Sequence, residues 1–167
     1  MYEVKEIFKN GESLPLATGG SLRIVFIGTD SAFAKRRRKS NILVIQGNHH
    51  LLIDCVTQRP LALNDLGLSV LDVRCYHPTH SHADHIRGLE EVALMNRYTP
   101  NISKPGMIIL RDYQDILWSK SLAGGCEYCE ADQGDLCSCR IFLTFFARRI
   151  LRLKEESSGP TSTVLLN

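Results

Sequence analysis

The chain has 167 residues, of which 44% are hydrophobic, and a formal net charge of +2 at pH 7. This length and apolar content predict one domain with a hydrophobic core, and they exclude a disulfide-rich mini-scaffold or a disordered tail. So small a charge does not by itself indicate nucleic acid or a membrane surface. No apolar run suits a signal peptide or a membrane span, so we expect a cytoplasmic protein without a membrane partner. Its six cysteines are then expected to be reduced thiols or ligands.

The first third of the chain predicts a lead-in followed by three strands. Residues 1–20 contain three glycines and a proline, which is typical of a loop. Apolar, β-favouring runs then predict strands over Leu22–Ile27, Ile42–Gln46 and Leu51–Cys55. Gly47-Asn48-His49-His50 separates the last two runs and has the composition of a hairpin turn, so both histidines are expected to be solvated.

The middle of the chain predicts alternating helices and strands. Helical spacing of apolar residues favours a short helix over Leu61–Leu66, and longer ones over Ala83–Arg97 and Asp112–Ala123. Strands are expected over Leu68–Tyr76 and Met107–Leu110. This alternation predicts βα units and an α/β class.

The densest chemical signal is the stretch THSHADHIRGLE, which contains His80, His82, Asp84 and His85 within six residues. Imidazole nitrogen and carboxylate oxygen are ligands that Zn²⁺ accepts. His80 and His82 are two apart in an extended loop and project to the same side, whereas Asp84 and His85 are adjacent at a helix start and diverge. The spacing therefore predicts a dinuclear metal site with one pair of ligands for each ion. The alternative is a set of loop polar residues without a ligand role, which the HxHxDH pattern disfavours.

This motif resembles the metal-binding signature of the metallo-β-lactamase fold superfamily. The segments SLRIVFIGTDSA, NILVIQ and LLIDC resemble the opening strands of one branch, which holds tRNA 3′-end-processing ribonucleases and related phosphodiesterases. Asp30 and Val56 depart from that pattern, because glycine is usual at both places. The resemblance extends over residues 21–123.

The resemblance implies a fold, an activity and cofactors. The fold would be an αββα sandwich, of which this chain carries the N-terminal half. The activity would be metal-dependent hydrolysis of a phosphodiester, by a nuclease or phosphodiesterase, with two ions of Zn²⁺ or Mn²⁺ activating a water. Asp84 would have a catalytic role in orienting that water. Asp54, at the end of a predicted strand, is expected to accept a hydrogen bond from a ligand histidine, although a simple capped strand end is the alternative.

Five consecutive cations follow the first predicted strand: Lys35, Arg36, Arg37, Arg38 and Lys39. Runs of this kind are usually solvated loops. In the resembled branch the preceding turn lies beside the metal centre, which makes the five residues candidate phosphate-binding groups. Both interpretations stay open, and a phosphodiester or nucleic-acid substrate would favour the second.

The end of the chain departs from the resembled pattern. Each metal in that family takes a further histidine and a bridging aspartate from downstream, but no histidine follows His85. Two alternatives to phosphodiester hydrolysis are therefore kept. One is a partial or degenerate domain that binds metal without turnover, and the other is a thioester or lactam hydrolase. A natural short form, a truncation and a frame shift are all compatible with the sequence, as is a homo-oligomer.

Residues 124–167 are expected to form a cysteine-rich and basic tail outside the 21–123 half-domain. A CxxC and a CxC follow closely on one another, at Cys126, Cys129, Cys137 and Cys139, and are either a structural zinc site or free thiols. Arg140–Glu156 mixes apolar and basic residues and predicts an amphipathic helix laid on the core. His77, just before Pro78, is expected to be structural.

Overall fold

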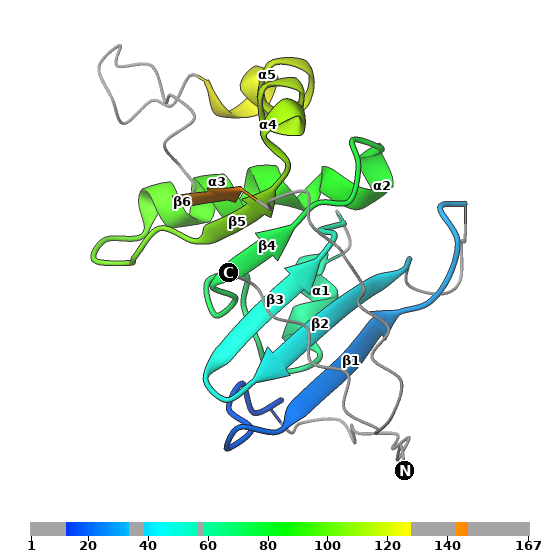
Figure 1. Ribbon diagram of the computed structural model, residues 1–167, viewed down its shortest axis with the longest axis vertical. Helices are drawn as coiled ribbons and strands as arrows, with labels where there is room; N and C mark the ends of the chain where they lie inside the picture. Colours follow the sequence, from blue (N-terminus) through cyan, green and yellow to red (C-terminus); the bar gives the residue numbers. More distant parts are fainter. Residues whose placement is uncertain (1–12, 34–38, 57–58, 128–142, 147–167) are drawn as a thin grey trace, which may run out of the picture.

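The computed structural model describes residues 13–33, 39–56, 59–127 and 143–146, which form one six-stranded sheet with helices packed on it (Figure 1). This mixed architecture confirms the predicted α/β class. The strands are β1 (Leu22–Gly28), β2 (Asn41–Gln46), β3 (His49–Ile53), β4 (Cys75–His77), β5 (Gly106–Ile109) and β6 (Leu143–Phe146). The helices are α1 (Arg59–Asn64), α2 (Ala83–Ile86), α3 (Gly88–Tyr98), α4 (Arg111–Leu117), the π-helix η1 (Trp118–Leu122) and α5 (Ala123–Cys126). None of these helices is both long and apolar enough to cross a membrane.

The strands lie in the sheet in their sequence order, from β1 to β6. The first three form an antiparallel meander, and β3 to β6 are parallel. Gly47 has a φ of 58°, a left-handed conformation that glycine adopts without steric cost, so the chain reverses over only two residues. His49 and His50 consequently belong to β3, and their prediction as turn residues is wrong. His49 is exposed, whereas burial lowers the pKa of the half-buried His50.

The predicted strand over Leu68–Tyr76 is wrong for all but its last two residues, because β4 begins at Cys75. The preceding residues form a turn that side chains stabilise. The Asp72 carboxylate accepts a hydrogen bond from the Ser69 N–H at 2.7 Å, and the Ser69 hydroxyl accepts one from the Leu71 N–H at 3.2 Å. Such local bonds from Ser and Asp offer the backbone an alternative to a sheet ladder.

The helix predicted over Ala83–Arg97 is divided at Arg87 into α2 and α3. The division occurs where the helix meets the chain that follows β3. The Gly88 N–H donates to the Cys55 carbonyl at 2.7 Å, and a Cβ at residue 88 would lie only 2.7 Å from the Cys55 Sγ. Glycine is required at this position because no other residue allows so close an approach.

The predicted helix over Arg140–Glu156 is wrong where the structure describes it, because Leu143–Phe146 is strand β6 and pairs in parallel with β5. A short apolar run in a parallel strand cannot be distinguished from a buried helical segment by periodicity alone. The rest of that segment lies outside the described residues. The division of the chain at residues 20 and 123 stays a prediction.

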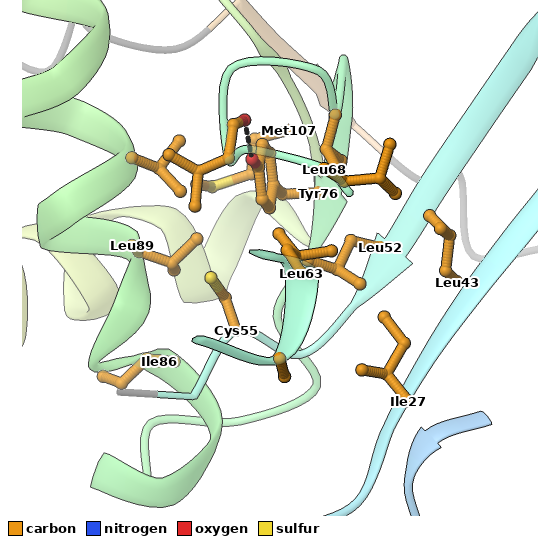
Figure 2. Packing of buried hydrophobic residues seen from close by; sticks show 14 of the residues in the cluster. Ile27, Leu43, Leu52, Cys55, Leu63, Leu68, Tyr76, Ile86, Leu89 and Met107 are labelled. Carbon is orange, nitrogen blue, oxygen red and sulfur yellow. Dashed lines mark hydrogen bonds between the residues drawn. The ribbon is translucent and has the colours of Figure 1, made fainter. Parts of the chain in front are cut away.

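The hydrophobic core lies between one face of the sheet and helices α1 and α3 (Figure 1). Successive strands place one buried side chain each at the same height, so the core follows the strand register. The Tyr76 ring lies among this group, near Leu63 and Met107 in Figure 2, and its hydroxyl donates to the Val70 carbonyl at 2.7 Å. The sheet residues of this layer are Val25, Leu43, Leu52, Tyr76 and Met107.

The opposite face of β1 is apolar and exposed. Leu22, Ile24 and Phe26 alternate along the strand with core residues, and their side chains are 62%, 50% and 65% exposed. The face continues through their register partners on β2, where Val44 and Ile42 are half-buried. Contiguous apolar surface of this kind on a soluble protein usually marks an interface or an aggregation hazard.

We expect the isolated chain to associate or to bind a hydrophobic dye through this face. Replacing Leu22, Ile24 and Phe26 together by threonine keeps β propensity and removes most of the apolar surface, so dye fluorescence and particle size should both fall. Light scattering with a hydrophobic dye measures the effect. A monodisperse, dye-silent wild-type monomer with a sharp melting transition would contradict it.

Candidate metal centre

The predicted ligands gather at the edge of the sheet where β3 and β4 end. These two strands are parallel and pair at their last residues, so the chain leaves both at the same edge. The residues that follow are Asp54 after β3, and His80, His82, Asp84 and His85 after β4. The fold therefore brings together all four predicted ligands and the predicted outer carboxylate.

The side chains of the four predicted ligands form two pairs. His80 Nε2 lies 3.0 Å from His82 Nδ1, and His85 Nε2 lies 3.4 Å from an Asp84 carboxylate oxygen. Zinc bonds of about 2.0–2.1 Å place tetrahedral donor atoms about 3.3 Å apart, so both spacings suit donors that share an ion. The His80 and His85 rings adjoin, with centroids 4.0 Å apart. Among the described residues, no group of three or more His, Cys, Asp or Glu side chains is placed to hold one ion.

Asp54 contacts both Thr79, just before the histidines, and His85 on α2 through its side chain. It is 8% exposed and has a φ of 60°, a left-handed conformation that is unfavourable for most residues other than glycine. A carboxylate only accepts hydrogen bonds, so His85 Nδ1–H donates to its Oδ2 at 2.7 Å. Its Oδ1 accepts from both the N–H and the hydroxyl of Thr79, each at 2.8 Å. His85 therefore carries a proton on Nδ1, and Nε2 is the ring nitrogen that faces Asp84.

Thr79 connects Asp54 to His80 and determines which ring nitrogen of His80 carries a proton. Because its hydroxyl proton goes to Asp54, its oxygen accepts from His80 Nδ1–H at 3.0 Å. His80 then carries its lone pair on Nε2, the atom that faces His82. The HxHxDH spacing does not single out Thr79, although it immediately precedes the motif.

Tyr113 contacts the loop that contains His80 and His82. It lies on α4, and its hydroxyl oxygen accepts a hydrogen bond from Ser81, the residue between the two histidines, at 2.8 Å. Burial raises the pKa of Tyr113, the bond from Ser81 opposes that effect, and the nearby charge of Asp54 adds to it. No sequence signal links Ser81 to a residue 32 positions away, so this contact becomes visible only in the fold.

A pocket of about 260 Å³ opens beside the ligands. One wall is made by His82, Asp84 and His85, and the other by the chain ends that flank residues 34–38. Lys39 lines this second wall, so one of the five predicted phosphate-binding cations faces the candidate centre. The other four, residues 35–38, lie outside the described part of the chain. The complete lining is Asp30, Ser31, Ala32, Lys39, Ser40, His82, Asp84 and His85.

Two other predicted residues lie away from the pocket. His77 Nδ1–H donates to the Ile108 carbonyl at 2.9 Å, which links β4 to β5 as expected of a structural histidine. Cys126 is buried at the end of α5, and the other cysteines of its cluster lie outside the described residues. The prediction of a cysteine zinc site there stays untested.

Comparison with known proteins identifies the family. A model described as Anti-Pycsar protein Apyc1 matches residues 22–158. The chain belongs to this family. It is 39% identical over 105 residues to an Apyc1 of Paenibacillus sp. (strain J14), a match that covers 63% of this chain and 42% of that protein. It is 35% identical over 144 residues to an Apyc1 of Bacillus phage BSP38, a match that covers 86% of this chain and 54% of that protein. The chain thus spans about half the length of these Apyc1 relatives.

Solved structures are similar to parts of this Apyc1-family chain, with TM-scores below 0.5 for the two described next. One is a diphosphatase of the PhnP family, with a TM-score of 0.48 and 18% identity, which covers 59% of this chain and 45% of that one. Another is MEM-A1, a subclass B3 metallo-β-lactamase from a soil metagenome, with a TM-score of 0.46, 18% identity, and coverage of 83% and 47%. The sequence resemblance indicates the superfamily and does not reach the Apyc1 family itself.

We expect Tyr113→Phe to destabilise the protein by about 1 kcal/mol, because it removes the oxygen that accepts the Ser81 bond and keeps the ring. In a Ser81→Ala background, Tyr113→Phe should leave the free energy of unfolding almost unchanged. Urea unfolding of the four proteins in this cycle gives the coupling. Tyr98→Phe, at an exposed tyrosine on α3, is the matched control; equal effects at both tyrosines would argue against the contact.

Proposed function

We propose that this member of the Anti-Pycsar protein Apyc1 family is a metal-dependent hydrolase of phosphodiesters, with a cyclic nucleotide as its substrate. The observation that carries the proposal is the pair of donor sets, His80 with His82 and Asp84 with His85, beside a pocket that also contains Lys39. The family supports the substrate class, because Anti-Pycsar proteins act on cyclic nucleotides. Phosphodiester chemistry also agrees with the basic run that begins at Lys35.

The residues present suit a divalent cation in both chemistry and spacing. His80 Nε2 and His82 Nδ1 would hold one ion, and Asp84 and His85 Nε2 the other. When bound, Zn²⁺ or Mn²⁺ supplies a water of lowered pKa and polarises the phosphoryl oxygen. Two protein donors are fewer than the three or four usual for zinc, so each ion needs further ones.

The chain's own residues prepare this site before substrate arrives. Asp54, directly or through Thr79, holds a proton on Nδ1 of two imidazoles, so that His85 and His80 direct their Nε2 atoms to the proposed ion sites. Asp84 lines the pocket as well as facing His85, which supports its proposed role in orienting an attacking water.

Lys39 is proposed to neutralise the phosphate. Its backbone is held at the pocket because the Asn41 side-chain amide donates to its carbonyl at 2.9 Å. An ammonium group in a partly enclosed pocket attracts a phosphodiester more strongly than one in open solvent. The remaining cations of residues 35–39 are proposed to act in the same way.

The proposed function predicts the metal content of the protein. The purified chain should bind zinc or manganese, and His80→Ala combined with His82→Ala should lower the bound metal because one donor pair is lost. Elemental analysis after dialysis measures the difference. His49→Ala, at an exposed histidine on β3, should bind as much metal as the wild type. Equal metal in the double variant and the wild type would remove the basis of the proposal.

The proposed function also predicts the reaction. With added Zn²⁺ or Mn²⁺, the protein should hydrolyse bis(p-nitrophenyl) phosphate and a cyclic nucleotide, and Asp84→Asn should lower kcat/KM by about 100-fold or more. A tRNA precursor, a thioester and a cephalosporin complete the substrate panel. Turnover of the last two alone would assign the lactam or thioester alternative. Bound metal without any turnover would favour a metal-binding domain without activity.

A further inference from the structure

Asp30 is a carboxylate in the wall of the pocket, facing the same space as the candidate ligands. Its position is fixed by the chain on both sides. Its Oδ1 accepts a hydrogen bond from the Ser31 N–H at 2.9 Å, and its carbonyl accepts from the Ser40 N–H at 2.9 Å and the Ser40 hydroxyl at 3.1 Å. The backbones of Asp30 and Lys39 form an isolated parallel β-bridge, so the two residues belong to one wall of the pocket.

A negative charge at this place needs a reason, because the proposed substrate is itself an anion. Like charges in a partly enclosed site repel one another, and an ionised carboxylate can only accept hydrogen bonds. Asp30 therefore cannot bind the phosphate group, which Lys39 suits. It suits a part of the substrate that carries a hydrogen-bond donor close to the phosphate.

A cyclic nucleotide offers one such donor on its sugar. In a 3′,5′-cyclic ribonucleotide both the 3′ and the 5′ oxygens are esterified, so the 2′-hydroxyl is the only free hydroxyl of the ribose. It stands on the carbon next to the 3′ ester, and it therefore enters the pocket together with the phosphate. Carboxylates are used to bind a ribose 2′-hydroxyl in dinucleotide-binding proteins.

We propose that Asp30 accepts a hydrogen bond from the ribose 2′-hydroxyl and makes the pocket select cyclic ribonucleotides over 2′-deoxy analogues. This inference rests on the proposed function, because it assumes a cyclic nucleotide in the pocket. A hydrogen bond to a charged group corresponds to a preference of about 10- to 100-fold. A site that accepts such a bond also rejects the analogue that leaves its acceptor unpaired.

The test compares cyclic AMP with 2′-deoxy cyclic AMP on the full chain. Turnover is measured as kcat/KM with added Zn²⁺ or Mn²⁺, and binding is measured by calorimetry on metal-free protein, in which hydrolysis cannot proceed. The wild type should prefer the ribonucleotide about 10- to 100-fold. Asp30→Ala should lower kcat/KM and affinity for cyclic AMP but not for 2′-deoxy cyclic AMP. The preference for cyclic AMP over its 2′-deoxy analogue should then fall to a ratio close to one. Asp30→Asn keeps an acceptor oxygen and should keep part of the preference.

Asp115→Ala removes one exposed negative charge from α4, away from the pocket, and should leave the ratio unchanged. A wild-type ratio near one, or a ratio that survives Asp30→Ala, overturns the inference while leaving phosphodiester hydrolysis intact. If neither cyclic nucleotide nor bis(p-nitrophenyl) phosphate is hydrolysed, the proposed function fails, and the binding ratio alone decides the role of Asp30. Equal or undetectable binding of both nucleotides then overturns it too.

Discussion

The candidate site depends on the Asp54 carboxylate, because this one group binds both Thr79, in the loop before the histidines, and His85, on the helix after them. It accepts hydrogen bonds from Thr79 and from His85, and through Thr79 it sets the tautomer of His80. Its left-handed backbone is an unfavourable conformation for aspartate, so the surrounding contacts must offset that cost. Such strain at a buried acceptor is typical of functional sites. Without this carboxylate, both imidazoles could rotate or change tautomer freely.

The backbone next to Asp54 connects the site to the core. Cys55 donates its N–H to the His85 carbonyl at 2.6 Å and accepts from the Gly88 N–H at 2.7 Å. The chain that leaves β3 is therefore bonded to the last turn of α2 and to the first residue of α3. Ile86 and Leu89, which Figure 2 shows beside Cys55, bury the same segment against the sheet. Core packing thus fixes the direction in which Asp84 and His85 point.

Local patterns predicted the parts of this site that local geometry determines. The HxHxDH spacing predicted one pair of ligands for each ion, and the family resemblance suggested that Asp54 contacts a ligand histidine. The structure puts His80 beside His82, Asp84 beside His85, and Asp54 in contact with His85, while a ligand role for these residues stays a prediction. Contacts between distant residues could not be predicted, because nothing in the sequence ties Ser81 to Tyr113. The errors have a similar origin. Ser69 and Asp72 form side-chain bonds in a turn where a strand was predicted, and Leu143–Phe146 pairs with β5 where a helix was predicted.

The exposed apolar face of β1 lies close to the proposed ion sites, which have only two donors each. Phe26, the most exposed of the three β1 side chains, precedes Asp30 by four residues, so they lie within about 14 Å along the chain. Any polypeptide layer that buries Phe26 is therefore close to the pocket wall. In the proposed function each donor pair needs one or two further ligands, and a layer at that place is near enough to supply them. Under the proposed function, a layer that covers the apolar face would also bring its own side chains next to the proposed ion sites, and the free energy of burying β1 would help to position them.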